Sequence, residues 1–163
     1  MPDFSGISTH VVDEKRRITI PKRFFEHIEK ELDQQKKFML TLGPDGCLLL
    51  MPKETWEQAA GARDSSYFTS ERERDRRRLM IGFAEDGTPD RAARLFLPEM
   101  LREAAEIKSS ITGVVLQGIG DVIEIWSPAV WEQRVQKKLL SDPTLFDDDI
   151  PATAGPTVSA SGP

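Results

Sequence analysis

Metal-binding and redox residues are scarce in this sequence. It has one cysteine, Cys47, and two histidines, His10 and His27, among 163 residues. One cysteine excludes an intrachain disulfide and a zinc site made of several thiolates. The two histidines stand far apart in the chain, without the close spacing that is typical of metal ligands. The sequence therefore predicts neither a bound metal nor a cofactor.

Long apolar runs are also lacking. No stretch reaches the roughly 18 apolar residues that a membrane span needs, and the opening MPDFSGISTH lacks the basic-then-apolar pattern of a signal peptide. The expectation is a cytoplasmic protein with no membrane partner. The G-x-S-x-G, Walker, G-x-G-x-x-G and H-E-x-x-H motifs of common enzymes are missing too. We therefore predict that the chain is not an enzyme.

Positive charge is in the minority, but it is concentrated. The chain has 22 Lys and Arg against 27 Asp and Glu, which gives a net charge of −5. Residues 141–163 contain acids but no base, so the rest of the chain is nearly neutral. Residues 15–23 contain several cations and no acid. Because local patches decide anion binding more than total charge does, the acidic balance does not exclude nucleic acid as a partner.

An internal repeat is the strongest pattern in the chain. Residues 11–28 match residues 88–105 at an offset of 77, and residues 45–58 match residues 120–133 at an offset of 75. The matched pairs include Asp13 and Asp90, Arg17 and Arg94, Pro21 and Pro98, and Trp56 and Trp131. Both blocks occur in the same order in each half, so the chain contains two similar units.

Each unit predicts the same series of elements. A polar turn with Asp and Arg precedes a short strand, 18–20 or 95–97, whose apolar residues alternate. Pro21 and Pro98 are expected at the first position of a helix. A hairpin with a Gly-containing turn and a second helix follow in each unit. Between the units, we expect a loop at 61–69 and an Arg-rich helix that starts at Ser70 and ends near Gly82.

The two units are too small to fold independently. A unit of about 45–50 residues rarely buries enough apolar surface, so we expect the two to pack about a pseudo-twofold axis. This places Arg17 and Arg94 in equivalent positions. The predicted fold is α+β, with two interleaved hairpin units that form a pseudo-twofold β-barrel with peripheral helices. The predicted divisions are unit 1 (7–54), a helical linker (55–82), unit 2 (83–128), a C-terminal helix (129–140) and a disordered acidic tail (141–163).

The repeated motif resembles a known DNA-binding module. Asp-x-x-x-Arg-[Ile/Leu]-x-[Ile/Leu]-Pro, followed by a short helix and a β-hairpin, is similar to the AbrB-type swapped-hairpin domain. Two copies in one chain of this length resemble the MraZ family of bacterial transcriptional regulators. Phe4-Ser5-Gly6, the segment from Gly46 to Trp56 and the segment from Arg74 to Ala84 also fit that family. The resemblance covers roughly residues 4–138.

The resemblance implies a function and a partner. Such a regulator, in particular a repressor, binds double-stranded operator DNA upstream of a division and cell-wall gene cluster, often its own operon. The family implies ring-shaped homo-oligomers and association with the nucleoid. Two alternatives stay open, namely an AbrB-type antitoxin and a scaffold ring that no longer binds DNA. The fused double unit argues against the antitoxin, because antitoxins of this type usually carry one domain and pair as dimers.

The candidate DNA contacts are the cations of the two turns. A planar guanidinium can bind a phosphate or a guanine edge through two hydrogen bonds, so Arg17 is the better reader of the first turn. For Arg94, DNA contact and a structural role are left open, and Asp13 and Asp90 are expected to accept hydrogen bonds from backbone N–H groups. The predicted DNA-binding residues are Lys15, Arg16, Arg17, Arg91 and Arg94, with Lys22 and Arg23 as additional contacts.

The chain departs from the family motif at the turns. The family usually carries Gly where this sequence has Arg16 and Ala93, and Arg where it has Ser5. Glycine would serve a turn with positive φ, and a side chain there costs ~1 kcal/mol. Either the turn differs here or the strain is tolerated. Pro89 interrupts the first strand of the second unit, which predicts an edge position.

Overall fold

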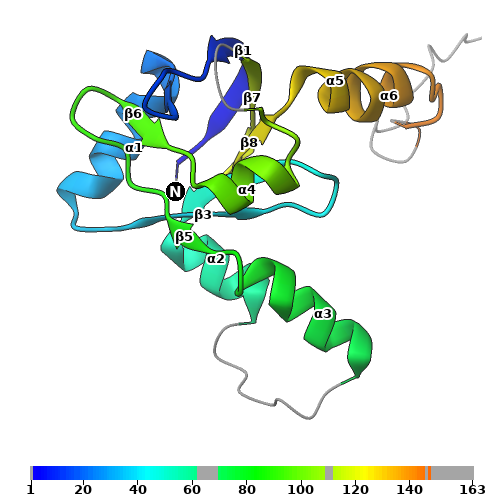
Figure 1. Cartoon of the computed structure of the whole chain (residues 1–163), viewed down its shortest axis with the longest axis horizontal. Coiled ribbons are helices and arrows are strands. Elements are labelled where there is room, and N and C mark those ends of the chain that lie inside the picture. Colours follow the sequence, from blue (N-terminus) through cyan, green and yellow to red (C-terminus); the bar gives the residue numbers. More distant parts are fainter. Residues whose placement is uncertain (1, 62–69, 109–111, 146, 148–163) are drawn as a thin grey trace, which may run out of the picture.

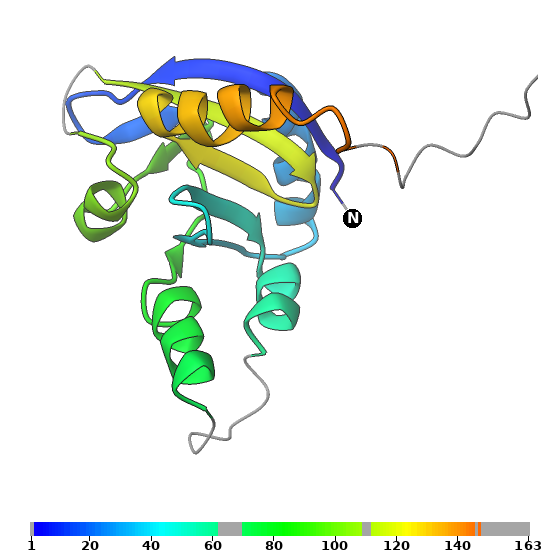
Figure 2. The ribbon, with the colours of Figure 1, turned by 90° about the vertical axis from the view of Figure 1, so that its right-hand side faces the viewer.

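The computed structural model describes residues 2–61, 70–108, 112–145 and 147. Within these residues, an antiparallel six-stranded sheet and a separate two-stranded ribbon are accompanied by helices (Figures 1 and 2). The strands are β1 (Phe4–Val11), β2 (Arg17–Thr19), β3 (Phe38–Leu42), β4 (Leu48–Pro52), β5 (Glu85–Asp86), β6 (Arg94–Phe96), β7 (Gly113–Gly120) and β8 (Ile123–Trp126). The architecture is thus mixed α and β, as predicted.

The strand order shows that the two units are interleaved. The six-stranded sheet runs β1-β7-β8-β4-β3-β5, with the two hairpins side by side at its centre. The first strand of unit 1, β1, pairs with the unit 2 hairpin, and the first strand of unit 2, β5, pairs with the unit 1 hairpin. Exchanging the units leaves this order unchanged. The short strand β5 lies at an edge of the sheet, as the position of Pro89 predicted.

The register shows the pseudo-twofold relation at the level of residues. Strands β2 and β6 pair antiparallel with Ile18 opposite Leu95 at the centre. Beyond the pairs of the ribbon, Ile20 N donates to the Ala93 carbonyl at 2.7 Å, and Leu97 N donates to the Arg16 carbonyl at 2.9 Å. These two hydrogen bonds are equivalent under the repeat offset. The ribbon formed by β2 and β6, called the β2–β6 ribbon below, therefore places the two repeated turns at equivalent positions.

Strand pairing gives an open sheet. Among the described residues, β1 and β5 are the two edges of the six-stranded sheet and do not pair with each other. The β2–β6 ribbon forms a separate sheet. The closed barrel that we predicted is therefore not formed by the strand pairing in this part of the chain. The ribbon joins the sheet by packing, because Ile18 and Leu95 lie in the main core at 0% and 1% exposure.

The main core is built from equivalent residues of the two units. The short-strand segments, the first helices and the central hairpin strands contribute matching buried side chains from the two halves. The buried pairs are Ile18 and Leu95, Ile20 and Leu97, Phe24 and Leu101, Leu48 and Ile123, and Leu50 and Ile125. Each unit thus supplies half of one core that neither could form alone.

A second apolar cluster covers the opposite face of the sheet. Cys47, Val115 and Trp126 are buried there, beneath residues of the C-terminal helical segment. That segment consists of α5 (Pro128–Trp131), a π-helical stretch η1 (Glu132–Lys137) and α6 (Lys138–Leu140). Ser127 caps it by accepting a hydrogen bond from Val130 N. The segment begins one residue before the predicted C-terminal helix and ends where it was expected.

The first helix of each unit follows its proline. Helix α1 spans Lys22–Asp33, and α4 spans Glu99–Ala104. Pro21 and Pro98 have ψ values of 142° and 146°, which are extended, so each proline caps its helix. The prediction that these prolines occupy the first helical position was therefore wrong by one residue. A proline still fits the N-cap, since the N–H that it lacks has no partner within the helix.

Two helices extend from the sheet as an arm (Figures 1 and 2). They are α2 (Lys53–Ala60) and α3 (Glu71–Met80), so the predicted division between residues 54 and 55 falls inside α2. Ser70 Oγ caps α3 by accepting from Glu73 N. The predicted loop at 61–69 lies, apart from Gly61, outside the described residues. The same holds for residues 146 and 148–163 of the predicted tail.

Candidate nucleic-acid interface

The first turn is closed by hydrogen bonds around Asp13. Asp13 N donates to the Arg17 carbonyl at 2.8 Å, and Arg16 N donates to the Asp13 carbonyl at 2.9 Å. The Asp13 side chain then accepts from Arg17 N at 2.9 Å. Asp13 therefore links both ends of the turn, as an aspartate side chain in a turn commonly does.

The second turn repeats this geometry. Asp90 N donates to the Arg94 carbonyl at 2.9 Å, and Ala93 N donates to the Asp90 carbonyl at 3.0 Å. The Asp90 side chain accepts from Arg94 N at 2.9 Å and from Ala92 N at 2.9 Å. Both aspartates accept hydrogen bonds from backbone N–H groups, which confirms the structural role that the sequence predicted for them.

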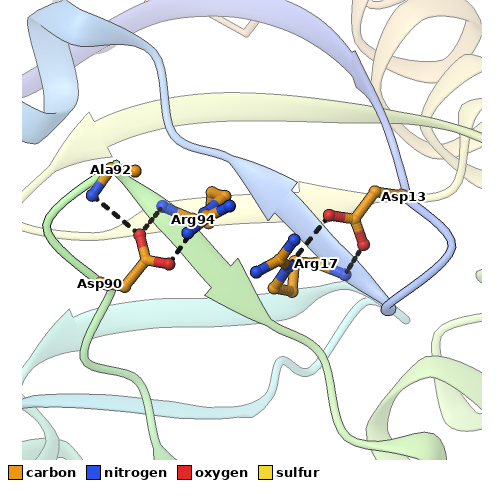
Figure 3. Close-up of polar contacts among 5 residues, drawn as sticks. All are labelled: Asp13, Arg17, Asp90, Ala92 and Arg94. Atoms are coloured by element: carbon orange, nitrogen blue, oxygen red, sulfur yellow. Dashed lines mark hydrogen bonds and ion pairs between the residues drawn. The ribbon is translucent and has the colours of Figure 1, made fainter.

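Each aspartate also orients the arginine of its own turn. Arg17 Nε donates to Asp13 Oδ2 at 3.0 Å, and Arg94 Nε donates to Asp90 Oδ2 at 2.8 Å (Figure 3). Within the described part of the chain, the terminal nitrogens of both guanidinium groups make no hydrogen bond. The two guanidinium groups are thus fixed at one edge, with the opposite edge available for a further acceptor.

Hydrogen bonding keeps both carboxylates ionised. The backbone N–H of Arg17 lowers the pKa of Asp13, and the arginine side chain adds to this effect. The backbone N–H of Arg94 lowers the pKa of Asp90 in the same way. At neutral pH both aspartates therefore carry a full negative charge, and both Asp–Arg pairs are present.

The turns keep the backbone conformation of the glycine that they lack. Arg16 has φ = 63° and Ala93 has φ = 60°, in the left-handed region that favours glycine. The sequence left two explanations open, a different turn or a tolerated strain. The second is correct, because both turns have the left-handed conformation. The hydrogen bonds around each aspartate stabilise the turn against this cost of ~1 kcal/mol.

The outward face of the ribbon carries both arginines. Ile18 and Leu95 point into the core, so their strand neighbours point outward. The Arg17 and Arg94 side chains are 23% and 42% exposed, respectively. They lie on neighbouring strands of the same ribbon (Figure 3). The structure therefore brings together the two arginines that the repeat placed in equivalent positions.

The remaining turn cations are exposed. Lys15, Arg16 and Arg91 all lie in the two turns and are open to solvent. The side chains of these three residues make no hydrogen bond or ion pair with another described residue. Together with the two arginines of the ribbon, they place five positive charges at the two turns.

The additional cations of α1 have partners within the chain. Lys22 Nζ lies 3.9 Å from Glu26 Oε1 in an exposed ion pair. Arg23 Nη2 donates to the Ile7 carbonyl of β1 at 2.7 Å, and its guanidinium lies 5.0 Å from the centre of the Phe24 ring. Arg23 thus links α1 to the edge strand β1, a role that the sequence did not indicate. A DNA contact from either residue stays a prediction.

Phe96 is an exposed residue of this face that the site prediction missed. It lies directly opposite Arg17 in the ribbon, and 54% of its surface is exposed. The sequence held a signal for this position, because Leu95 and Leu97 alternate with Phe96 and were expected inside. Within the described ranges, no three His, Cys, Asp or Glu residues gather as metal ligands, and no helix could cross a bilayer.

Comparison with known proteins supports the two-unit organisation. A family described as "MraZ protein, putative antitoxin-like" matches residues 4–78 and 80–147. A protein of Thiobacillus denitrificans named transcriptional regulator MraZ is 33% identical over 136 residues, which cover 83% of this chain and 88% of that protein. Proteins with the same name from Roseiflexus sp. and Herpetosiphon aurantiacus are 32% and 35% identical, respectively. These matches cover 88% and 93% of this chain, and 93% and 94% of those proteins.

Proposed function

The chain belongs to the MraZ family, and on this premise we propose that it is a transcriptional regulator that binds double-stranded operator DNA through the β2–β6 ribbon. One observation carries the proposal. Arg17 and Arg94 lie on one outward face, each held by its own aspartate at 3.0 Å and 2.8 Å, respectively, with the terminal guanidinium nitrogens unpaired among the described residues. The relatives of this chain are named as transcriptional regulators, which agrees with this role.

The chemistry of the ribbon suits duplex DNA. A two-stranded ribbon fits the major groove, where an arginine fork can bind the two acceptors of a guanine. Lys15, Arg16 and Arg91 would contact phosphates, which position a protein without reading sequence. Lys22 and Arg23 are proposed as further phosphate contacts at the start of α1. Because each Asp–Arg pair is fixed before binding, little side-chain entropy is lost on contact.

The resemblance to the family suggests the regulated genes. We propose that the chain represses a division and cell-wall gene cluster, its own operon included, and acts in the cytoplasm at the nucleoid. Binding to the DNA upstream of its own gene tests this directly. A fluorescence anisotropy titration should show tight binding to that DNA and weak binding to a shuffled duplex of the same composition.

Assembly would strengthen the contact. One ribbon offers a small footprint, whereas specific modules bury about 600–1,000 Å² or more. We propose a ring-shaped homo-oligomer, which multiplies weak contacts through effective concentration. Light scattering should give a mass several times 18.3 kDa. A monomer at micromolar concentration would contradict the ring.

A matched pair of variants tests the site itself. Arg17→Ala should weaken binding to upstream DNA, because it removes one oriented guanidinium. Arg134→Ala is the control, since Arg134 is also exposed but lies on η1, which covers the opposite face of the sheet. Both variants should melt cooperatively. Equal DNA binding by parent and Arg17→Ala would show that the ribbon is not the interface.

An antitoxin role is the second candidate, because the matching family is described as antitoxin-like. An antitoxin would form a stable complex with a toxin protein. A regulator would bind its DNA equally well without such a complex. A scaffold ring without DNA binding is the third. Specific binding that weakens steeply as salt rises favours the regulator over the scaffold, because phosphate contacts release counterions.

A further inference from the structure

We propose that Phe96 reads a thymine by contacting its C5-methyl group in the major groove. The inference rests on the proposed DNA-binding function and adds a base-reading residue to the ribbon. Phe96 is 54% exposed on the outward face, directly opposite Arg17. An aromatic side chain on this face provides an apolar contact between the flanking cations.

The hydrogen-bond pattern of the ribbon brings Phe96 close to Arg17. Leu97 N donates to the Arg16 carbonyl, and Ile20 N donates to the Ala93 carbonyl. In an antiparallel pair, the positions between such hydrogen-bonded pairs have the closer side chains. Arg17 and Phe96 occupy one of these positions. The two side chains therefore approach the same part of a bound ligand.

The charge around Phe96 favours DNA as the occupant. Arg17 lies opposite it, and Arg94 lies two residues away on the same face of β6. Asp13 and Asp90 pair with the Nε atoms of these arginines but leave their terminal nitrogens without acceptors. A second protein copy would have to bury those nitrogens beside the aromatic ring, which is costly unless it supplies acceptors of its own. In the major groove, phosphates and guanine acceptors satisfy the cations while the thymine methyl is the apolar group that a phenyl ring can contact.

The proposal also distinguishes the two halves of the ribbon. The repeat offset places Thr19 where the second unit has Phe96, and Thr19 pairs with Arg94 as Phe96 pairs with Arg17. The backbone is pseudo-symmetric, but only one half offers a large apolar group. We therefore expect the ribbon to recognise a DNA sequence that is asymmetric about the centre of the ribbon.

The test combines a protein change with a DNA change. A random duplex library selected with the whole chain supplies the bound sequence, in which each thymine is replaced singly by deoxyuridine to remove its methyl group. At the one thymine that Phe96 contacts, replacement by deoxyuridine should lower the affinity of the parent about fourfold, which is the effect of one buried methyl group. Phe96→Ala should bind the thymine duplex about fourfold more weakly and show no further loss with deoxyuridine. Met100→Ala, which removes an exposed apolar side chain on α4, is the matched control.

The outcomes separate this inference from the proposed function. Loss of methyl sensitivity in Phe96→Ala alone supports the contact. If Phe96→Ala keeps the sensitivity, or if the parent has none, Phe96 does not read a methyl group even when Arg17→Ala abolishes binding. If Arg17→Ala binds like the parent, the ribbon itself is not the interface and both proposals fail. A change of molecular mass in Phe96→Ala with unchanged methyl sensitivity would instead assign Phe96 to a contact between copies.

Discussion

The two turns of the ribbon have the same backbone conformation but differ in their side chains. Their matching hydrogen bonds agree in length within 0.1 Å for the three backbone donors, and φ at the strained position is 63° in one and 60° in the other. Between the aspartate and the arginine, the first turn has Glu14, Lys15 and Arg16, whereas the second has Arg91, Ala92 and Ala93.

The comparison shows which residues determine the turn. The aspartate and the arginine recur with the same contacts, so they are sufficient to hold this conformation across two sets of intervening residues. The intervening side chains are exposed apart from the half-buried Ala93. They are therefore free to vary the charge of each turn without altering its shape.

The largest expected effect is on DNA affinity. Replacing Arg17 or Arg94 by Ala should cost about 1–3 kcal/mol of binding per contact. Arg17→Ala should weaken binding more, because the first turn carries more cations. Gel shifts and thermal melts at one salt concentration measure both variants. Folded Arg94→Ala that binds more weakly than Arg17→Ala would reverse the order of the two turns.

Glycine substitution should separate backbone strain from charge. Arg16→Gly and Ala93→Gly should each raise the free energy of unfolding by up to about 0.5 kcal/mol, because the entropy cost of glycine offsets at least half of the ~1 kcal/mol of left-handed strain that is relieved. The gain should be similar in the two turns, since φ is nearly the same. Only Arg16→Gly should also weaken DNA binding. Denaturant titrations and anisotropy measure the two properties, and unequal gains in stability would mean that the turns differ in strain.

A charge exchange should alter the salt dependence. Lys15 and Ala92 are equivalent under the repeat. If Lys15 contacts a phosphate, Lys15→Ala should reduce the slope of log affinity against log salt by about 0.9. Ala92→Lys should increase the slope by a similar amount if the second turn also faces the DNA. Titrations at several salt concentrations provide the slopes, and an unchanged slope in Ala92→Lys would place the second turn away from the phosphates.

The smallest expected effect is on stability in acid. Since the pKa values of Asp13 and Asp90 are lowered from 3.8, their stabilising contribution is present above that pH and is lost as the pH falls through the lowered values. Asp13→Asn and Asp90→Asn should each lower Tm by a few degrees at neutral pH, with a difference from the parent that shrinks in acid. Glu14→Gln is the exposed control. A difference that stays constant with pH would show that ionisation of these carboxylates does not stabilise the turns.

Patterns that repeat within the sequence predicted the local structure well. The Asp-to-Arg spacing predicted both turns, and the alternation around Ile18 and Leu95 predicted two strands with a buried centre. These features depend on residues within a few positions of one another. The exact start of α1 and α4 was missed, because Pro21 and Pro98 satisfy the preferences of a cap as well as those of the first helical turn.

Contacts between distant segments were harder to anticipate. Arg23 was expected as a DNA contact on its charge alone, whereas it also donates to the Ile7 carbonyl, which lies sixteen residues away in β1. Phe96 was assigned only to a strand, although it lies opposite Arg17 on the outward face. In both cases the partner depends on how strands meet, and local spacing carries no information about that.

The sequence alone determined that this protein has two equivalent units, each with an Asp–Arg turn, a short strand and a hairpin, because residue spacing and alternation act locally. Only the tertiary structure decided that the first strand of each unit pairs with the hairpin of the other. It also decided that the ribbon stays separate from an open sheet and that Phe96 lies opposite Arg17. Those outcomes depend on how two small apolar surfaces bury each other, which is a property of the whole chain rather than of any one segment.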